Sequence, residues 1–279
     1  MHAPRRRKPE GSARAVIAVA ALVVAVLIAG PLAAIFAFAL ERGFAPALEV
    51  LQRSDVHAAL GLSALAAGVT VPFVTVFGTA AAWVITRTEL PGRKLLLGLV
   101  NVPFAIPPVV SGLLIVLTLG PRTPAGAWFA AQGLPVCFAA PAVVLATSLV
   151  SLGVVAKDLV PLLETLGPAE EIAARALGAS PLQAFWRVTM PGLRLPLLHA
   201  AVGALARALG EFGSVTVVSG RIRGETMTVP LLIEALYGEY DKTAAFALAA
   251  MLALVALGAV ALKKSVELAF ERGAGSLSP

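Results

Sequence analysis

The chain has 279 residues, of which 58% are hydrophobic and only 14% are charged, with a formal net charge of +6 and a mean hydropathy of +0.89. Soluble domains carry about 25% charged residues, and their cores need far less apolar material, so we infer that the excess faces lipid. Three His and one Cys exclude a disulfide framework and a Cys/His site for zinc or haem, so we expect no cofactor and no metal.

Six apolar segments each supply about the 20 residues that a bilayer crossing needs. They are residues 15–40, 58–86, 95–119, 134–156, 195–219 and 243–262. Only the segment 195–219 contains charged residues, Arg207 and Glu211. Because hydrocarbon offers no water to backbone groups, such segments are expected to be helices. The sequence therefore predicts an all-α integral membrane protein with six transmembrane helices in one domain, residues 15–270.

The first apolar segment has two features of a secretory signal peptide. A basic run precedes it at residues 5–8, and the sequence Ala-Phe-Ala at residues 37–39 resembles a cleavage site. The hydrophobic part of a cleaved signal is only ~7–15 residues long, however, and five more apolar segments follow here. We therefore expect an uncleaved first helix, with residues 1–14 as a basic cytoplasmic N-terminus. A cleaved signal is the alternative.

The third apolar segment contains a cluster of prolines in the sequence VPFAIPPVVSGLL, residues 102–114. Each proline removes a backbone N–H and displaces the carbonyl four residues before it. Within a membrane, this is tolerated only where protein or a water-filled cavity satisfies the freed groups. Pro107, Pro108 and the nearby Ser111 therefore mark either a packing kink or a break that lines a substrate path.

The longest polar stretch, residues 157–196, is predicted to form a helix–turn–helix. Pro168 followed by Glu170 and Glu171 is typical of a helix start, because acidic side chains favour the positive N-terminal end. Gly178 is expected to close this first helix. A second helix is expected to begin with a Ser-Pro-Leu-Gln capping box at residues 180–183 and to end at Pro191. Such a loop is suited to docking into another protein, although an amphipathic helix on a lipid surface has the same periodicity.

The fifth apolar segment contains a cation deep in the membrane. At 1.5 Å per residue, Arg207 lies roughly 18 Å from the cytoplasmic end of its predicted helix. An intramembrane arginine is costly and is therefore a functional candidate. Glu211 lies four residues on, so Arg207 either forms an i,i+4 ion pair with it or contacts a passing anion. Arg221 and Arg223, in the next loop, are expected either to meet an anion or a binding protein, or to be solvated.

The distribution of Lys and Arg predicts the orientation in the membrane. With the N-terminus inside, the cytoplasmic segments hold fifteen of these residues and the outer loops hold six, and Arg207 completes the 22. Both termini, including the tail 271–279, are therefore expected in the cytoplasm. The basic balance follows from this topology, and no aromatic-interleaved basic groove indicates nucleic-acid binding.

Residues 170–191, EEIAARALGASPLQAFWRVTMP, resemble the EAA loop of ABC-transporter permeases. Ala173, Ala174, Gly178 and Pro191 fall in the family register, whereas the family's Glu position is Ile172 and the carboxylates come one and two places earlier. The resemblance implies a type I importer fold in which this loop docks on a separate ATPase subunit. A Glu-to-ATPase ion pair is then either supplied by Glu171 or absent. The sequence itself contains no G-x-x-x-x-G-K-[ST], so the energy must come from a partner.

The second half of the chain narrows the resemblance. ARALGEFG at residues 206–213, SGRIRG at 219–224 and GEY at 238–240 are similar to sulfate/thiosulfate importer permeases, specifically the second of their two permease subunits. This implies a bacterial inner-membrane permease that is not itself an enzyme and that pairs with a related permease, two ATPase subunits and a periplasmic binding protein. A molybdate/tungstate permease, as a homodimer, is the near alternative. An ion-coupled secondary anion transporter is the alternative of another class.

Overall fold

The computed structural model describes residues 11–88 and 92–275, with side chains for residues 15–88 and 92–268. Residues 1–10 of the predicted N-terminal segment and residues 276–279 of the predicted tail therefore lie outside the described residues. All regular structure in the described ranges is helical. The elements are α1 (Gly11–Ala39), α2 (Phe44–Val50), α3 (Ser54–Arg87), α4 (Arg93–Ala105), α5 (Pro108–Leu119), α6 (Pro124–Ala131), α7 (Ala140–Ser151), α8 (Val154–Leu166), α9 (Ala169–Ala176), α10 (Pro181–Ala184), the π-helical turn η1 (Phe185–Thr189), α11 (Met190–Leu209), α12 (Gly213–Val218), α13 (Val229–Gly238) and α14 (Lys242–Gly275).

Five helical spans in the described residues are long and apolar enough to cross a membrane, and the bent pair α4–α5 makes a sixth when it is counted as one span. The first and second predicted segments coincide with α1 and α3 to within four residues, and the sixth begins with α14, which continues past the predicted end to Gly275. The expected all-α architecture with up to six crossings is therefore confirmed.

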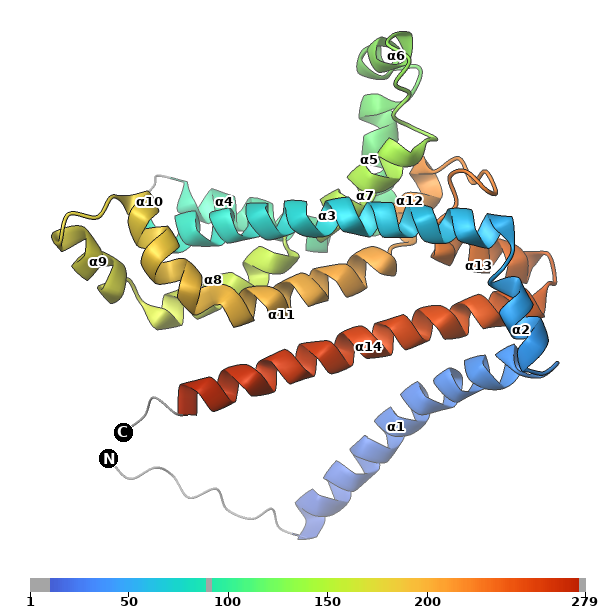
Figure 1. Cartoon of the computed structure of the whole chain (residues 1–279), viewed down its shortest axis with the longest axis horizontal. Coiled ribbons are helices and arrows are strands. Elements are labelled where there is room, and N and C mark those ends of the chain that lie inside the picture. Colours follow the sequence, from blue (N-terminus) through green and yellow to red (C-terminus); the bar gives the residue numbers. More distant parts are fainter. Residues whose placement is uncertain (1–10, 89–91, 276–279) are drawn as a thin grey trace.

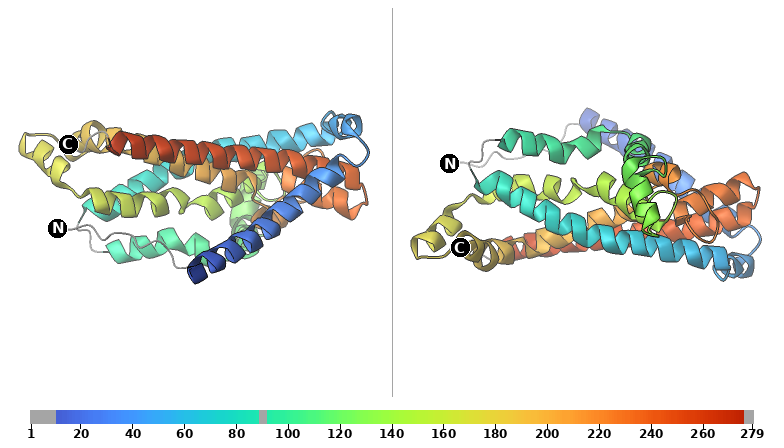
Figure 2. Two further views of the ribbon diagram at one scale, coloured as in Figure 1. Left: turned by 90° about the horizontal axis from the view of Figure 1, so that it is seen from below. Right: turned by 90° about the horizontal axis from the view of Figure 1, so that it is seen from above.

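The long helices α3, α11 and α14 lie side by side along the long axis of the molecule (Figures 1 and 2). Their apolar residues form two main clusters. One joins α3 to α13 and α14 through residues such as Val56, Leu232 and Leu248, and the other joins α3 to α8 and α11 through Ile85 and Leu159. Helix α9 lies at one end of this bundle, and α2 and α13 lie at the other (Figure 1).

Helix α1 packs mainly on α14 and diverges from it toward its N-terminal end (Figure 1). Phe38 stacks on Phe246 with ring centroids 5.0 Å apart. Further toward the N-terminus, Leu27 remains 68% exposed, and no residue in the most apolar window of α1 is buried. A helix that is apolar on all sides and exposed in this way is suited to lipid or to another membrane helix.

The predicted fourth span, residues 134–156, was wrong in its boundaries. Residues 134–139 are not helical, and the span runs over Ala140–Leu166 as α7 followed by α8. Pro141 lies in the first turn of α7, where proline is well tolerated. Lys157 and Asp158 lie in α8 beyond the predicted end, but the opposite face of the helix buries Leu159 and Leu163 fully. The charged turn at Lys157 and Asp158 therefore belongs to an amphipathic helix that extends the span beyond its predicted end.

The predicted fifth span, residues 195–219, was also misplaced, because the helix runs over Pro181–Leu209 and stops at Gly210. Pro191 does not end the second coupling helix as expected. It lies in the first turn of α11, directly after η1, where the Met190 N–H bonds to the Phe185 carbonyl five residues back. This wider turn changes the carbonyl register ahead of the proline, so the helix continues from the loop into the membrane.

Candidate functional site

The coupling loop has the predicted helix–turn–helix structure. The α9 helix begins after Pro168 and ends in a turn at Gly178, whose φ of +93° favours glycine. The Gly178 N–H bonds to the Arg175 carbonyl, and the Ala179 N–H bonds to the Ala174 carbonyl, which is the pattern of a Schellman motif. Local sequence signals therefore fix the turn.

The second helix of the loop begins with the predicted capping box. The Ser180 hydroxyl accepts from the Gln183 N–H at 3.2 Å, and the Gln183 side chain accepts from the Ser180 N–H at 2.9 Å. The two bonds satisfy N–H groups that a helix start otherwise leaves unpaired. Since α10, η1 and α11 follow without a break, the end of the turn is attached directly to a transmembrane helix.

The coupling loop exposes four large apolar side chains, Ile172, Leu177, Leu182 and Trp186, which we call the exposed apolar ridge. Their side chains are 59%, 91%, 64% and 57% exposed, respectively. Ala173 and Glu170 are also exposed on α9. A ridge of this kind at the end of a membrane bundle is suited to contact with another protein.

Glu171 points in the opposite direction and is only 8% exposed. Its Oε1 accepts from Arg87 Nε at 2.9 Å and from the Thr189 hydroxyl at 2.6 Å, and its Oε2 accepts from Trp83 Nε1 at 3.3 Å. Burial by itself raises the pKa of this carboxyl, but the hydrogen bonds from Thr189 and Arg87, the Arg87 charge and the Trp83 bond outweigh it and lower the pKa. Glu171 is therefore an internal contact and does not project as Ile172 does.

Arg87 uses all three guanidinium nitrogens in this cluster. Besides Glu171, it donates to the Leu163 carbonyl at 3.0 Å and to the Gly167 carbonyl at 2.8 Å, so it caps the C-terminal end of α8. In the sequence, Arg87 is simply one of the fifteen basic residues on the predicted cytoplasmic side. Since 84 residues separate it from Glu171, no local pattern indicates the pair.

The prolines of the third span mark a true break, because α4 and α5 meet at an angle of 106°. Pro107 caps α5, and Pro108 begins it. The start of α5 packs closely on α12, where only glycine fits: a Cβ on Gly112 would lie 2.5 Å from the Ser214 carbonyl oxygen, and one on Gly213 would lie 2.9 Å from Pro108 Cβ. The break is therefore part of a tight contact between two short helices.

The Arg207–Glu211 ion pair, one of the two alternatives for Arg207, does not occur among the described residues, because α11 ends at Leu209, between the two side chains. The buried Glu211 carboxylate instead accepts from the Ser214 N–H at 2.9 Å and from its hydroxyl at 2.8 Å. Arg207 Nε donates to the Val150 carbonyl at 3.3 Å, and the terminal nitrogens of Arg207 make no hydrogen bond within the described part of the chain. Ser111, 2% exposed, lies on α5 next to Gly112, the residue that approaches Ser214 of α12.

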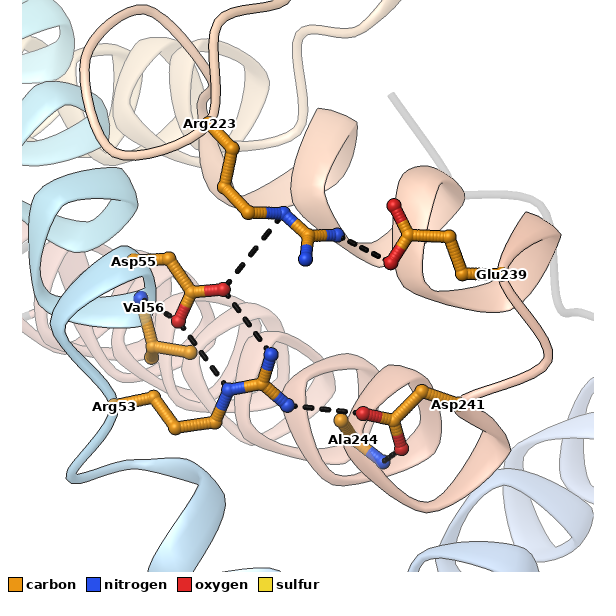
Figure 3. A network of polar contacts seen from close by, with 7 residues as sticks. All are labelled: Arg53, Asp55, Val56, Arg223, Glu239, Asp241 and Ala244. Atoms are coloured by element: carbon orange, nitrogen blue, oxygen red, sulfur yellow. Dashed lines mark hydrogen bonds and ion pairs between the residues drawn. The ribbon is translucent and has the colours of Figure 1, made fainter.

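Arg221 and Arg223, in the loop after α12, are neither free nor simply solvated. Arg221 pairs with Glu234 on α13. Figure 3 shows Arg223 between Glu239 at 2.6 Å and Asp55 at 3.8 Å, while Arg53 contacts Asp55 at 3.2 Å and Asp241 at 2.9 Å. The hydrogen bond to Asp241 raises the pKa of the Arg53 guanidinium, against an opposing effect of burial. These ion pairs join the loop to the start of α3 and to the α13–α14 turn.

Comparison with known proteins places these features in a family. The chain is 43% identical to the sulfate transport system permease protein CysW of Synechocystis sp., over 90% of this chain and 91% of the relative. It is 34% identical to the permease protein CysT of Escherichia coli, over 85% of both chains. A bacterial ABC transporter structure involved in alginate import matches with a TM-score of 0.65 at 17% identity, over 93% of this chain and 94% of that chain, which supports the fold alone.

The relatives are named as permease proteins, in agreement with the expectation that the chain is a permease subunit and not an enzyme. The family profile matches residues 76–269, which include the bent pair α4–α5, the coupling loop and the short helix α12. The chain therefore belongs to the family of binding-protein-dependent transport system inner membrane components.

Proposed function

We propose that this chain is the permease subunit of an ATP-driven importer for sulfate or thiosulfate in a bacterial cell membrane. The observation that carries the proposal is the 43% identity to a sulfate permease protein over nearly the whole of both chains. The higher identity to CysW than to CysT, 43% against 34%, supports the role of the second permease subunit, with a CysT-like chain as its partner.

The docking element for the ATPase, in this proposal, is the exposed apolar ridge of the coupling loop. Leu177, at 91% exposure, is its most prominent residue. Ile172 occupies the position of the family's Glu and is exposed, so an apolar contact there replaces an ion pair with the ATPase. The ridge lies in the cytoplasm together with both termini, and a periplasmic binding protein delivers the anion at the opposite end of the bundle.

The translocation path, also a proposal, passes the break between α4 and α5 and the ends of α11 and α12. The free terminal nitrogens of Arg207 support an anion contact, since guanidinium is well suited to oxyanions. Pro107, Pro108, Ser111 and Glu211 belong to the tight α5–α12 region beside it.

The test is uptake of radiolabelled sulfate into proteoliposomes that contain this chain, its partner permease, the ATPase and the loaded binding protein. We expect uptake only when ATP is supplied on the side of the membrane that carries the ATPase. Excess thiosulfate should suppress this uptake. Uptake driven by a proton or sodium gradient without ATP would overturn the ABC assignment, and suppression by molybdate alone would move the substrate to molybdate. Leu177→Glu, which changes only the exposed ridge, should abolish ATPase co-purification.

A further inference from the structure

The buried Glu171–Arg87 pair joins four structural elements at one point. Glu171 belongs to the first turn of α9, and its three donors come from α3 (Trp83 and Arg87) and from η1 (Thr189). Arg87 adds the end of α8 through the Leu163 and Gly167 carbonyls. The coupling helix α9 is thus connected to α3, through Arg87 to the end of α8, and through Thr189 to the start of α11.

Burial distinguishes this pair from a surface ion pair. The Arg87 and Glu171 side chains are 7% and 11% exposed, whereas those of the neighbouring Arg93–Glu164 pair are 45% and 51% exposed. An exposed pair contributes little, but breaking a buried one leaves an uncompensated charge and is strongly unfavourable. The carboxylate therefore holds α9 in one position relative to α3.

Helix α9 is connected to α3 mainly through this pair and its polar neighbours. Helix α9 packs against α10 and η1, while a hollow of about 500 Å³ lies between α9 and the end of α3, lined by Trp83, Arg87, Glu171 and Ile172 among others. Across this hollow, polar side chains provide the connection to α3. Thr189 is the last residue of the π-turn, the irregular segment at which the loop enters α11.

We propose that Glu171 is a positioning residue: with Arg87 and Thr189 it latches the coupling helix to α3 and η1, so that a displacement of α9 moves the transmembrane helices. Glu171 does not contact the ATPase, although its sequence position beside the family's Glu suggests that it does. This inference rests on the proposed docking of the ATPase at the exposed ridge of α9. Without the latch, α9 can move while α3 stays in place.

The experiment compares Glu171→Gln with Glu164→Gln, its exposed counterpart, in the reconstituted complex. We expect Glu171→Gln to keep ATPase co-purification while sulfate uptake per ATP hydrolysed falls roughly tenfold, which is ~1.4 kcal/mol of lost coupling. Amide hydrogen exchange in residues 169–176 should accelerate about tenfold in the full permease without ATPase. Glu164→Gln should match the wild type in all three measurements.

Thr189 supplies a second pair of variants in case Glu171→Gln assembles poorly. Thr189→Ser keeps the hydroxyl and should behave as wild type, whereas Thr189→Val keeps the shape, loses the bond to Glu171 and should reduce coupling about threefold. Loss of ATPase association in Glu171→Gln with unchanged exchange in α9 would make Glu171 a docking contact and overturn the latch, as would wild-type coupling. Undisturbed docking in Leu177→Glu would instead overturn the proposed docking ridge.

Discussion

At the scale of single residues, two acidic side chains have other partners than their sequence positions suggest. Both accept hydrogen bonds from residues of this chain. Glu171 lies beside the family's ATPase-facing position but faces inward, and Glu211 lies four residues after Arg207 but bonds to Ser214. In both cases a helix end decides the direction: Glu171 follows the start of α9, and Glu211 follows the end of α11. Spacing along an assumed continuous helix does not detect such ends.

The separation of Arg207 from Glu211 makes a single substitution informative. Arg207→Ala leaves no carboxylate unpaired, because Glu211 keeps both of its Ser214 bonds. If Arg207 contacts the passing anion, Arg207→Ala should assemble and hydrolyse ATP but lose sulfate uptake by about 10–100-fold, since a charged hydrogen bond contributes about 1.5–3 kcal/mol. Arg207→Lys should keep part of the uptake, because the charge remains while the planar fork is lost.

Glu211→Gln is the matched control for this prediction. Its amide oxygen still accepts from Ser214, so uptake should stay within about threefold of the wild type. Near-normal sulfate uptake in Arg207→Ala would end the anion-contact proposal.

At the scale of elements, the sequence predicted best where local chemistry decides. The Gly178 turn and the Ser180 capping box have short-range signals, and both are confirmed. The predicted fourth and fifth spans are misplaced because neither the charged turn nor the proline ends its helix. Burial of Leu159 outweighs the charged turn of α8, and the π-turn accommodates Pro191. These outcomes depend on tertiary packing, which a linear pattern does not contain.

The coupling turn yields a test of backbone conformation. A Cβ on Gly178 would meet no atom within 4 Å, so a substitution there costs backbone strain at φ +93° and no steric clash. Gly178→Asp should cost about 1–2 kcal/mol and weaken ATPase association about 5–30-fold, with membrane insertion intact. Quantitative co-purification of the ATPase measures this.

Gly192 provides the control within the same region. It lies in helical α11, and its added Cβ also meets no atom within 4 Å, so Gly192→Ala should leave association unchanged and raise helix stability by up to about 1 kcal/mol. Full co-purification and full uptake in Gly178→Asp would show that the loop is not the docking element.

At the scale of the whole molecule, the two ends of the helical bundle differ in their charged residues. The C-terminal end of α3, the coupling loop and the end of α14 lie toward one end (Figure 1), where the sequence places its excess of Lys and Arg. The opposite end holds the paired charges of Arg53, Arg223, Asp55, Glu239 and Asp241 (Figure 3). The orientation is expected to follow the number of Lys and Arg residues next to the spans, whether or not carboxylates pair with them, and this number is fifteen on the coupling-loop side against six on the other.

Labelling at the two ends tests this orientation directly. The native thiol is a poor reporter, because Cys137 is only 5% exposed and lies against the Ile115 carbonyl. In a Cys137→Ala background, we therefore choose Leu177→Cys on the coupling loop and Tyr240→Cys in the α13–α14 turn, where the native side chains are 91% and 85% exposed. A membrane-impermeant maleimide should label position 240 in intact spheroplasts and position 177 only in inverted vesicles without ATPase. The wild-type chain should stay unlabelled from both sides, and the reverse pattern would place the coupling loop and both termini outside the cell.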